Sequence, residues 1–281
     1  MRFKTLLLVL LAFVAQPAAA MSSPELGSLE QQLSSLVAGR TGEYGIAALD
    51  LSNGKQVSIN GNERFPMAST VKLAIAATYL AQVDHGRRSL DDRIAGTSAD
   101  ALMGRMLIHS DNRATDLLLA NLGGPTTVQT WLNFNGLSAI RIDRTIAQLL
   151  RDRRDLRDIR DSSSPNSMLG LLKLVNAGPA LKPTSRSYLL TLMARCATGR
   201  NRMKALLPSF TRVEHKTGTL NGLTSDVGFI TLPDGRRVAV AMFARYGNDR
   251  PRTFAQAGRS IYDAFVTAIR RPLDGFMLGA N

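Results

Sequence analysis

"FPMASTVKLAIAATYL", residues 65–80, places a lysine inside an otherwise apolar helical pattern. Lys72 stands among Val71, Leu73 and the run 74–77, and it follows Ser69 by one helical turn. Lysine is almost never fully buried without a partner, so a packed stem with its ammonium in water is the ordinary explanation. The alternative is that Lys72 is buried in order to act on Ser69. The choice depends on which other segments the fold brings to this helix.

The N-terminus predicts export. Residues 1–20, "MRFKTLLLVLLAFVAQPAAA", carry Arg2 and Lys4 before an apolar run and end in small residues. This is the pattern of a secretory signal peptide, whereas a membrane anchor needs about 20 apolar residues. We therefore expect cleavage near Ala20, a secreted or periplasmic protein, and no stable membrane anchor.

Composition predicts a soluble protein stabilised by its core. Cys196 is the single cysteine, so no intrachain disulfide can form, and its apolar neighbours predict a small buried side chain. The formal charge is +13, but the charges are spread along the chain. The densest block, residues 151–161, holds five Arg and four Asp, which predicts a solvated, salt-bridged segment rather than a nucleic-acid site. Its expected i,i+4 pairs are Arg151–Asp155, Arg154–Asp158 and Arg157–Asp161.

Hydrophobic periodicity divides the chain into three parts. An amphipathic helix is expected over residues 28–39, and a β-hairpin follows around the turn signal Asn53-Gly54. The pattern is then mostly helical from Ser69 to about residue 205. Strands return over residues 212–246, and a closing helix is expected over residues 254–270.

Strands at both ends of the chain predict one antiparallel sheet built from the two termini. The expected fold class is α/β (α+β), an antiparallel sheet flanked by helices plus a mostly helical subdomain. Residues 21–65 and 206–281 would form the first part and residues 66–205 the second, packed as one compact catalytic unit.

Two tripeptides add chemistry to the Ser69 helix. Ser110-Asp111-Asn112 falls between two helical patterns, and Lys216-Thr217-Gly218 lies on a predicted strand whose glycine would let a ligand approach the backbone. A serine hydroxyl is a poor nucleophile until a base takes its proton. Lys72 can be that base only if burial or a second cation lowers its pKa toward neutrality. Each tripeptide alone is ordinary, as a loop turn or a strand end.

Together and in this order, S-x-x-K, Ser-Asp-Asn and Lys-Thr-Gly form the triple signature of the penicillin-recognising serine hydrolases. The chain resembles the class A β-lactamases throughout its mature length. The similarity extends to "TGRNRMKALLP" (198–208) and "RDSSSPNSMLGLL" (160–172). It implies a β-lactamase/transpeptidase-like fold, and we expect a monomer without cofactor that acts on a β-lactam or peptidoglycan-like small molecule.

The resemblance implies the catalytic roles. Ser69 would be the acylated nucleophile, and Lys72 its base, directly or through water. Ser110 would relay a proton to the leaving nitrogen. Lys72 would then be buried because it is a base.

The resemblance also implies a binding set. Asn112 would bind the side-chain amide of the ligand. Lys216 and Thr217, next to Gly218, would hold its carboxylate, with Lys216 as the second cation that lowers the pKa of Lys72. The backbone N–H of Thr219 would complete an oxyanion hole with that of the nucleophile.

Other kinds of site have weaker support. The chain contains His85, His109 and His215, so a Ser-His-Asp site stays open, but no G-x-S-x-G elbow is present and we interpret the histidines as structural. No H-E-x-x-H or Cys/His cluster occurs, so no metal site is expected.

Two segments depart from the family. The connection between "LDDRI" (90–94) and "SADALMGRMLIHSDN" (98–112) is shorter than usual, so an aromatic wall of the ligand site is trimmed. The other segment, residues 141–161, resembles the Ω-loop that floors the class A site. In it Arg144 and Asp161 would form the ion pair that closes the neck of the loop.

The Ω-loop lacks the family's acid. Two residues after its Arg, class A enzymes carry a Glu that activates the deacylating water, and a later Asn helps to hold that water. This chain has Ile146 and Leu150 at those places. Asp152 or Asp155 could swing into the gap, although pairing with neighbouring arginines is the simpler fate of both.

Three functions therefore follow from the sequence. The first is a β-lactam hydrolase with slow deacylation. The second is a penicillin-binding or sensing protein that stays acylated, and the third is a D-alanyl-D-alanine carboxypeptidase with the same acylation chemistry.

Overall fold

The structure, a computed structural model, describes residues 24–267. The predicted signal peptide, residues 1–20, and the last residues of the predicted closing helix, 268–270, lie outside the described residues. Within the described part, no helix is long and apolar enough to cross a membrane.

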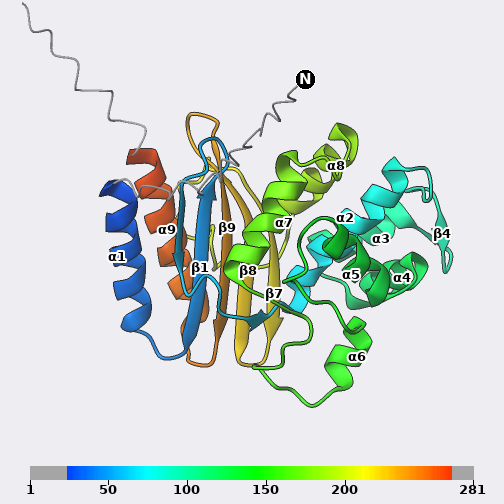
Figure 1. Ribbon diagram of the computed structural model, residues 1–281, viewed down its shortest axis with the longest axis horizontal. Coiled ribbons are helices and arrows are strands. Elements are labelled where there is room, and N and C mark those ends of the chain that lie inside the picture. Colours follow the sequence, from blue (N-terminus) through cyan, green and yellow to red (C-terminus); the bar gives the residue numbers. More distant parts are fainter. Residues whose placement is uncertain (1–23, 268–281) are drawn as a thin grey trace, which may run out of the picture.

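A five-stranded antiparallel sheet in the order β2-β1-β9-β8-β7 forms the centre of the molecule (Figure 1). Its strands are β1 Glu43–Asp50, β2 Gln56–Ile59, β7 Val213–Leu220, β8 Leu223–Thr231 and β9 Arg237–Arg245. The predicted hairpin joins β1 to β2, and β1 also pairs with β9 along its whole length. Strands from the two ends of the chain thus share one sheet, which confirms the predicted fold class.

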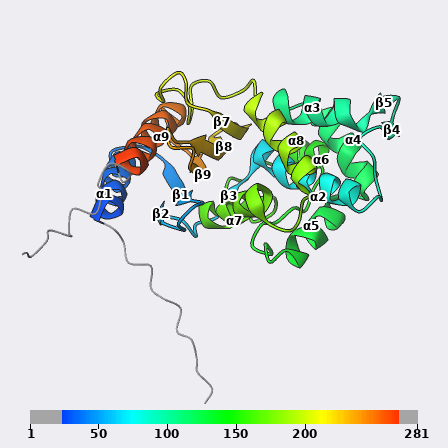
Figure 2. The ribbon, with the colours of Figure 1, turned by 90° about the horizontal axis from the view of Figure 1, so that it is seen from above.

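Two helices, α1 Pro24–Ala38 and α9 Arg250–Thr267, cover one face of the sheet (Figures 1 and 2). Their apolar stripes bury Leu29, Leu33 and Phe254 against sheet residues such as Met242. Both helices are amphipathic because only one side of each meets the sheet.

The opposite face carries the helical part of the chain. Its helices are α2 Val71–Asp84, α3 Ala99–Ile108, α4 Asn112–Leu122, α5 Pro125–Phe134, α6 Ile146–Arg151, α7 Pro165–Ala177 and α8 Pro183–Ala194. Two short strand pairs complete it, β3 Phe65–Pro66 with β6 Ser162–Ser163 and β4 Arg93–Ile94 with β5 Thr97–Ser98.

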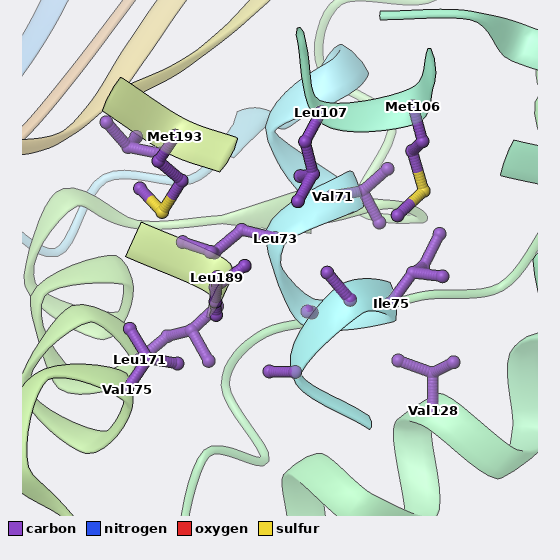
Figure 3. Packing of buried hydrophobic residues seen from close by; sticks show 14 of the residues in the cluster. Val71, Leu73, Ile75, Met106, Leu107, Val128, Leu171, Val175, Leu189 and Met193 are labelled. Atoms are coloured by element: carbon purple, nitrogen blue, oxygen red, sulfur yellow. The ribbon is translucent and has the colours of Figure 1, made fainter. Parts of the chain in front are cut away.

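Helix α2 runs through the middle of this part and is buried on every side from Val71 to Ala81. Figure 3 shows Leu73 pointing toward α8, at Leu189 and Met193, while Ile75 points to the other side. A helix surrounded by apolar neighbours is apolar all round, which explains why its sequence shows no polar face.

The pairing predicted within residues 151–161 is wrong. Helix α6 ends at Arg151 and the chain beyond it is not helical, so residues four apart do not share a face. The observed ion pairs are Arg144 with Asp152, Asp158 and Asp161, Arg160 with Asp152 and Asp158, and Arg157 with Glu43. Residues 152–161 therefore form a loop whose aspartates pair mainly with Arg144, and they do not form a helix.

Candidate active site

Ser69 lies in a 3-10 turn, Ala68–Thr70, that leads directly into α2. It is partly exposed, while every other residue from Phe65 to Ala81 is buried. Ala68, just before it, has a φ of +48°, a left-handed conformation that costs free energy for a residue with a side chain. The fold thus holds one hydroxyl at the surface of an otherwise closed segment.

Strand β7 lies against this turn because Gly218 has no side chain. A Cβ there would stand 2.3 Å from Ser225 Oγ and 2.6 Å from the carbonyl oxygen of Met67, both too close for real contacts. The Ser225 hydroxyl also donates to the Met67 carbonyl at 3.0 Å. The prediction that Gly218 makes room for a ligand is therefore wrong on this side of the strand, because protein atoms fill the space.

Lys72 is fully buried, so its ammonium does not reach water by snorkelling. Its Nζ donates to the Ser110 carbonyl at 2.7 Å, to Asn112 Oδ1 at 2.8 Å and to Ser110 Oγ at 3.2 Å. Ser110, in the link between α3 and α4, supplies two of these acceptors, and Asn112, the first residue of α4, supplies the third. An ammonium group has three donors, so Lys72 is fully partnered in its buried position.

Lys216 approaches the same hydroxyl from the sheet. It is also fully buried, and its Nζ donates to Ser110 Oγ at 3.0 Å and to the Thr217 carbonyl at 2.8 Å. Ser110 has a φ of +60°, a second strained residue in this region. One serine oxygen therefore joins an ammonium from α2 to an ammonium from β7.

The pKa of Lys72 is lowered to about 7, mainly by burial and secondly by the neighbouring Lys216 ammonium. Asp111 and Asp116 act weakly in the opposite direction. Burial is also the main cause that lowers the pKa of Lys216, to about 8. A lysine with a pKa near 7 can lose and accept a proton near neutral pH, which an ordinary lysine does not do.

Arg202, within the segment 198–208, is also buried, and the sequence predicted no role for it. Its guanidinium donates to the carbonyls of Gly218 and Ser225 at 2.9 and 3.0 Å and to Thr219 Oγ1 at 2.6 Å. Nothing in the sequence around Arg202 predicts that its side chain contacts the backbone of β7 and β8. Lys216 and Arg202 thus place buried positive charge at the site, which suits an anionic ligand.

The Ω-loop is fastened at two points. Arg144 Nε lies 2.6 Å from Asp161 Oδ2, which confirms the predicted neck pair. The second point was missed: the two oxygens of Asp116 accept from the backbone N–H groups of Ile146 and Ala147 at 2.7 and 2.9 Å. The spacing could have predicted that Asp116 faces the site, because Asp116 follows Asn112 by four residues and therefore lies on the same face of α4.

The space beneath the loop is small. A cavity of about 10 Å³ is enclosed there, with room for one water at most. Its lining residues are Ala68, Val71, Ile75, Arg144, Thr145, Ile146, Leu149 and Asp161. Ile146 itself is buried, so its apolar side chain fills part of this region.

The two aspartates that could have entered the gap have other partners. Asp152 Oδ2 accepts from Arg144 Nη1 at 2.8 Å. Asp155 Oδ1 accepts from the backbone N–H of Arg157 at 2.8 Å, in a turn of the loop. Both carboxylates are therefore used within the loop.

The three histidines lie in different parts of the structure. His215 is buried, and its Nδ1 lies 2.8 Å from the buried Asp226 carboxylate on the neighbouring strand. His85 and His109 are exposed at the ends of α2 and α3. Cys196 is buried, as predicted. Among residues 24–267 no three His, Cys, Asp or Glu side chains are grouped so that they could hold a metal ion.

The fold defines a class, the serine hydrolases of β-lactamase type. The sequence pattern of the Beta-lactamase enzyme family matches residues 28–265, and the chain belongs to this family.

Relatives and solved structures agree with this assignment. The chain is 30% identical over 267 residues to the extended-spectrum β-lactamase PER-1 of Pseudomonas aeruginosa, with 83% of this chain and 86% of the relative covered. It is 29% identical to the carbapenem-hydrolyzing β-lactamase KPC of Klebsiella oxytoca, covering 86% and 89% of the two chains. An ancestral (GNCA) class A β-lactamase superposes with a TM-score of 0.81 at 32% identity, over 84% of this chain and all of the other.

Proposed function

We propose that this protein opens β-lactams through an acyl-enzyme on Ser69 and releases the acyl group slowly. Two observations carry the proposal: the buried Lys72 has a lowered pKa and follows Ser69 by one helical turn, and the apolar Ile146 occupies the floor of the same site. The first feature supports acylation, and the second removes a base for hydrolysis of the adduct.

In acylation, Ser69 Oγ attacks the lactam carbonyl carbon while the free amine of Lys72 takes its proton. The backbone N–H groups of Ser69 and Thr219 stabilise the oxyanion, each worth about 3 kcal/mol in comparable reactions. The C–N bond then breaks, and the Ser110 hydroxyl gives its proton to the nitrogen while it receives from Lys72 the proton taken from Ser69. Ser110 is suited to this relay because it bonds to both lysine ammonium groups.

Binding uses the positive side of the site. The carboxylate of the ligand meets Lys216 and Thr217, with Arg202 adding charge through its contact with Thr219. Asn112 turns its Oδ1 to Lys72, so its amide N–H₂ is free to bind the side-chain carbonyl of the ligand.

Deacylation requires a water and a base for its proton. Ile146 can neither accept a proton nor hold a water, and the cavity beneath the loop has room for one water at most. Asp152 and Asp155 bond within the loop. General-base help is typically worth 10²–10⁴-fold, so the adduct should form faster than it is hydrolysed.

The apolar floor also favours a second candidate, a penicillin-binding or sensing protein that remains acylated. The two candidates differ only in the lifetime of the adduct. A D-alanyl-D-alanine carboxypeptidase shares the acylation step and would release D-alanine from a peptide substrate.

We also propose that the protein is exported as a monomer after cleavage near Ala20. The charged, apolar and small-residue pattern of residues 1–20 supports export. Edman sequencing of the protein recovered from the periplasm should begin near Met21, and an intact Met1 in that fraction would contradict cleavage.

The test is intact-protein mass spectrometry of the purified protein mixed with benzylpenicillin and followed over time. We expect one added penicillin mass within the burst, located on Ser69, which then disappears slowly. Absence of the adduct in a protein that also hydrolyses nothing would reject acylation. Steady hydrolysis at hundreds of turnovers per second would reject slow deacylation. Ser69→Ala is the control and should carry no adduct.

A further inference from the structure

Residues 151–160, which begin at the last residue of α6, form an exposed segment that we call the basic loop. The segment contains five arginines and three aspartates, and all five arginines are exposed. Figure 1 shows α6 and the green chain that follows it at the lower edge of the molecule. So many arginines on one exposed loop favour an anionic partner.

The three aspartates of the basic loop are already engaged. Two of them pair with Arg144, at 2.8 and 3.4 Å, and the third accepts a backbone N–H at 2.8 Å. In contrast, three of the arginines form no ion pair with any carboxylate of residues 24–267: Arg151, Arg153 and Arg154. The charge that the loop leaves for a partner is therefore positive.

Large apolar side chains lie beside these arginines. Leu150 is 51% exposed and Ile159 is 55% exposed, near the two ends of the loop. Tyr246, which follows β9, is 40% exposed, and the Arg157 guanidinium lies 5.7 Å from the centre of its ring. Arginines next to exposed apolar and aromatic side chains are typical of surfaces that enter the headgroup layer of a membrane. A soluble polyanion would gain little from the aliphatic side chains, because it has no apolar layer to cover them.

The basic loop is held in place by the rest of the fold. Its neck is the largely buried pair of Arg144 and Asp161, and the buried Arg245 donates to the carbonyl of Leu156 at 3.2 Å. These contacts fix the backbone at the neck and in the middle of the loop. The exposed side chains are therefore presented to a partner with little ordering cost.

We propose that the basic loop docks the protein reversibly on the surface of an anionic lipid bilayer. Arg151, Arg153 and Arg154 meet the lipid phosphates, while Leu150 and Ile159 enter the headgroup layer. Each arginine near an anionic membrane strengthens binding about fivefold, so the three together contribute about a hundredfold. The proposal does not depend on acylation.

The experiment measures how much protein, purified from the periplasm, sediments with vesicles of two compositions. One is phosphatidylcholine alone, and the other contains equal parts of phosphatidylcholine and phosphatidylglycerol. The first variant removes the three unpaired charges of the loop: Arg151→Gln, Arg153→Gln and Arg154→Gln together. The second removes the apolar side chains: Leu150→Ser and Ile159→Ser together.

The matched control removes three exposed arginines from other parts of the chain: Arg87→Gln, Arg93→Gln and Arg195→Gln together. It changes the net charge by the same amount as the first variant. Circular dichroism checks that every variant is folded.

We expect wild type to bind the vesicles that contain phosphatidylglycerol and not those of phosphatidylcholine alone, and high salt to release it. The partition coefficient should fall about a hundredfold in the arginine variant and about tenfold in the apolar variant. In the control it should fall less than about threefold, because charges away from the contact are screened.

Equal losses in the arginine variant and the control would show that net charge alone attracts the protein, and would overturn the docking surface. A wild type that binds neither vesicle, or both equally, would overturn it as well. Binding of soluble polyphosphate through the same three arginines, without binding to vesicles, would overturn the lipid partner and assign the loop to a soluble polyanion.

Discussion

The surroundings of the Lys72 ammonium and the floor of the Ω-loop differ in polarity. The Lys72 ammonium lies among polar acceptors, and the ammonium groups of Lys72 and Lys216 meet on the hydroxyl of Ser110. Beneath the Ω-loop the space is small, and Ile146 and Leu149 contribute apolar side chains to it.

This difference separates the two half-reactions of a serine hydrolase. In the proposed function, acylation needs a base beside the nucleophile, and we assign this role to Lys72 because it is buried and its pKa is lowered to about 7. Deacylation needs a second base with a water, and the described loop offers no free carboxylate at Ile146. A buried polar network is costly unless every member is satisfied, and the hydrogen bonds of the two lysines meet that condition.

The largest effect is expected from Lys72→Ala. Removing the base should slow labelling by fluorescent penicillin by 10²–10⁴-fold, because general-base help is typically of that size. The rate is measured by gel fluorescence over time, with Ser69→Ala as the unlabelled baseline. A labelling rate of Lys72→Ala within twofold of wild type would show that Lys72 is not the base for acylation.

The neck of the Ω-loop is tested by Asp161→Asn. Asp161 and Arg144 are both largely buried, with side chains 7% and 11% exposed, so loss of one partner should lower the free energy of unfolding by about 3 kcal/mol. Limited proteolysis should then cut between residues 145 and 160. The control is Arg157→Ala in the same loop, whose partly exposed pair with Glu43 should cost less than about 1 kcal/mol. Equal and small effects of the two substitutions would mean that the neck does not hold the loop.

The pH profile of acylation follows from the two lysines. Lys72 with a pKa of about 7 gains its free amine as pH rises, so the rate should increase about tenfold from pH 6 to pH 8. Lys216 with a pKa of about 8 then loses its charge, so the rate should fall above that value. Lys216→Arg keeps its charge at all these pH values and should remove the alkaline fall. A flat profile from pH 6 to 9 would contradict both assignments.

Much of the fold was predictable because its signals are local. The Asn53-Gly54 turn marks the first hairpin, and strong apolar runs mark the three strands after residue 212. The neck pair was predicted from a family motif. In contrast, the pairs of residues 151–161 failed because spacing predicts partners only inside a helix, and the loop leaves the helix at Arg151.

The parts of the site that sequence did not reveal depend on long-range contacts. Arg202 bonds to the backbone of β7 and β8, and Asp116 bonds to the backbone of α6. Backbone acceptors and donors leave no mark on the sequence of the partner segment. The need for a glycine at position 218 could not be predicted either. The atoms that exclude a side chain there belong to Met67, far away in the sequence, and to Ser225, on the next strand.

The central claim is that Ile146 sets the lifetime of the adduct. The most direct measurement is the half-life of the benzylpenicilloyl adduct, followed by mass spectrometry, in wild type, Ile146→Glu and the adjacent control Ala147→Glu, whose side chain is exposed. A carboxylate at Ile146 should shorten the half-life 10²–10⁴-fold, while one at Ala147 should change it little. An unchanged half-life in a folded Ile146→Glu protein, or equal shortening in both variants, would contradict the account.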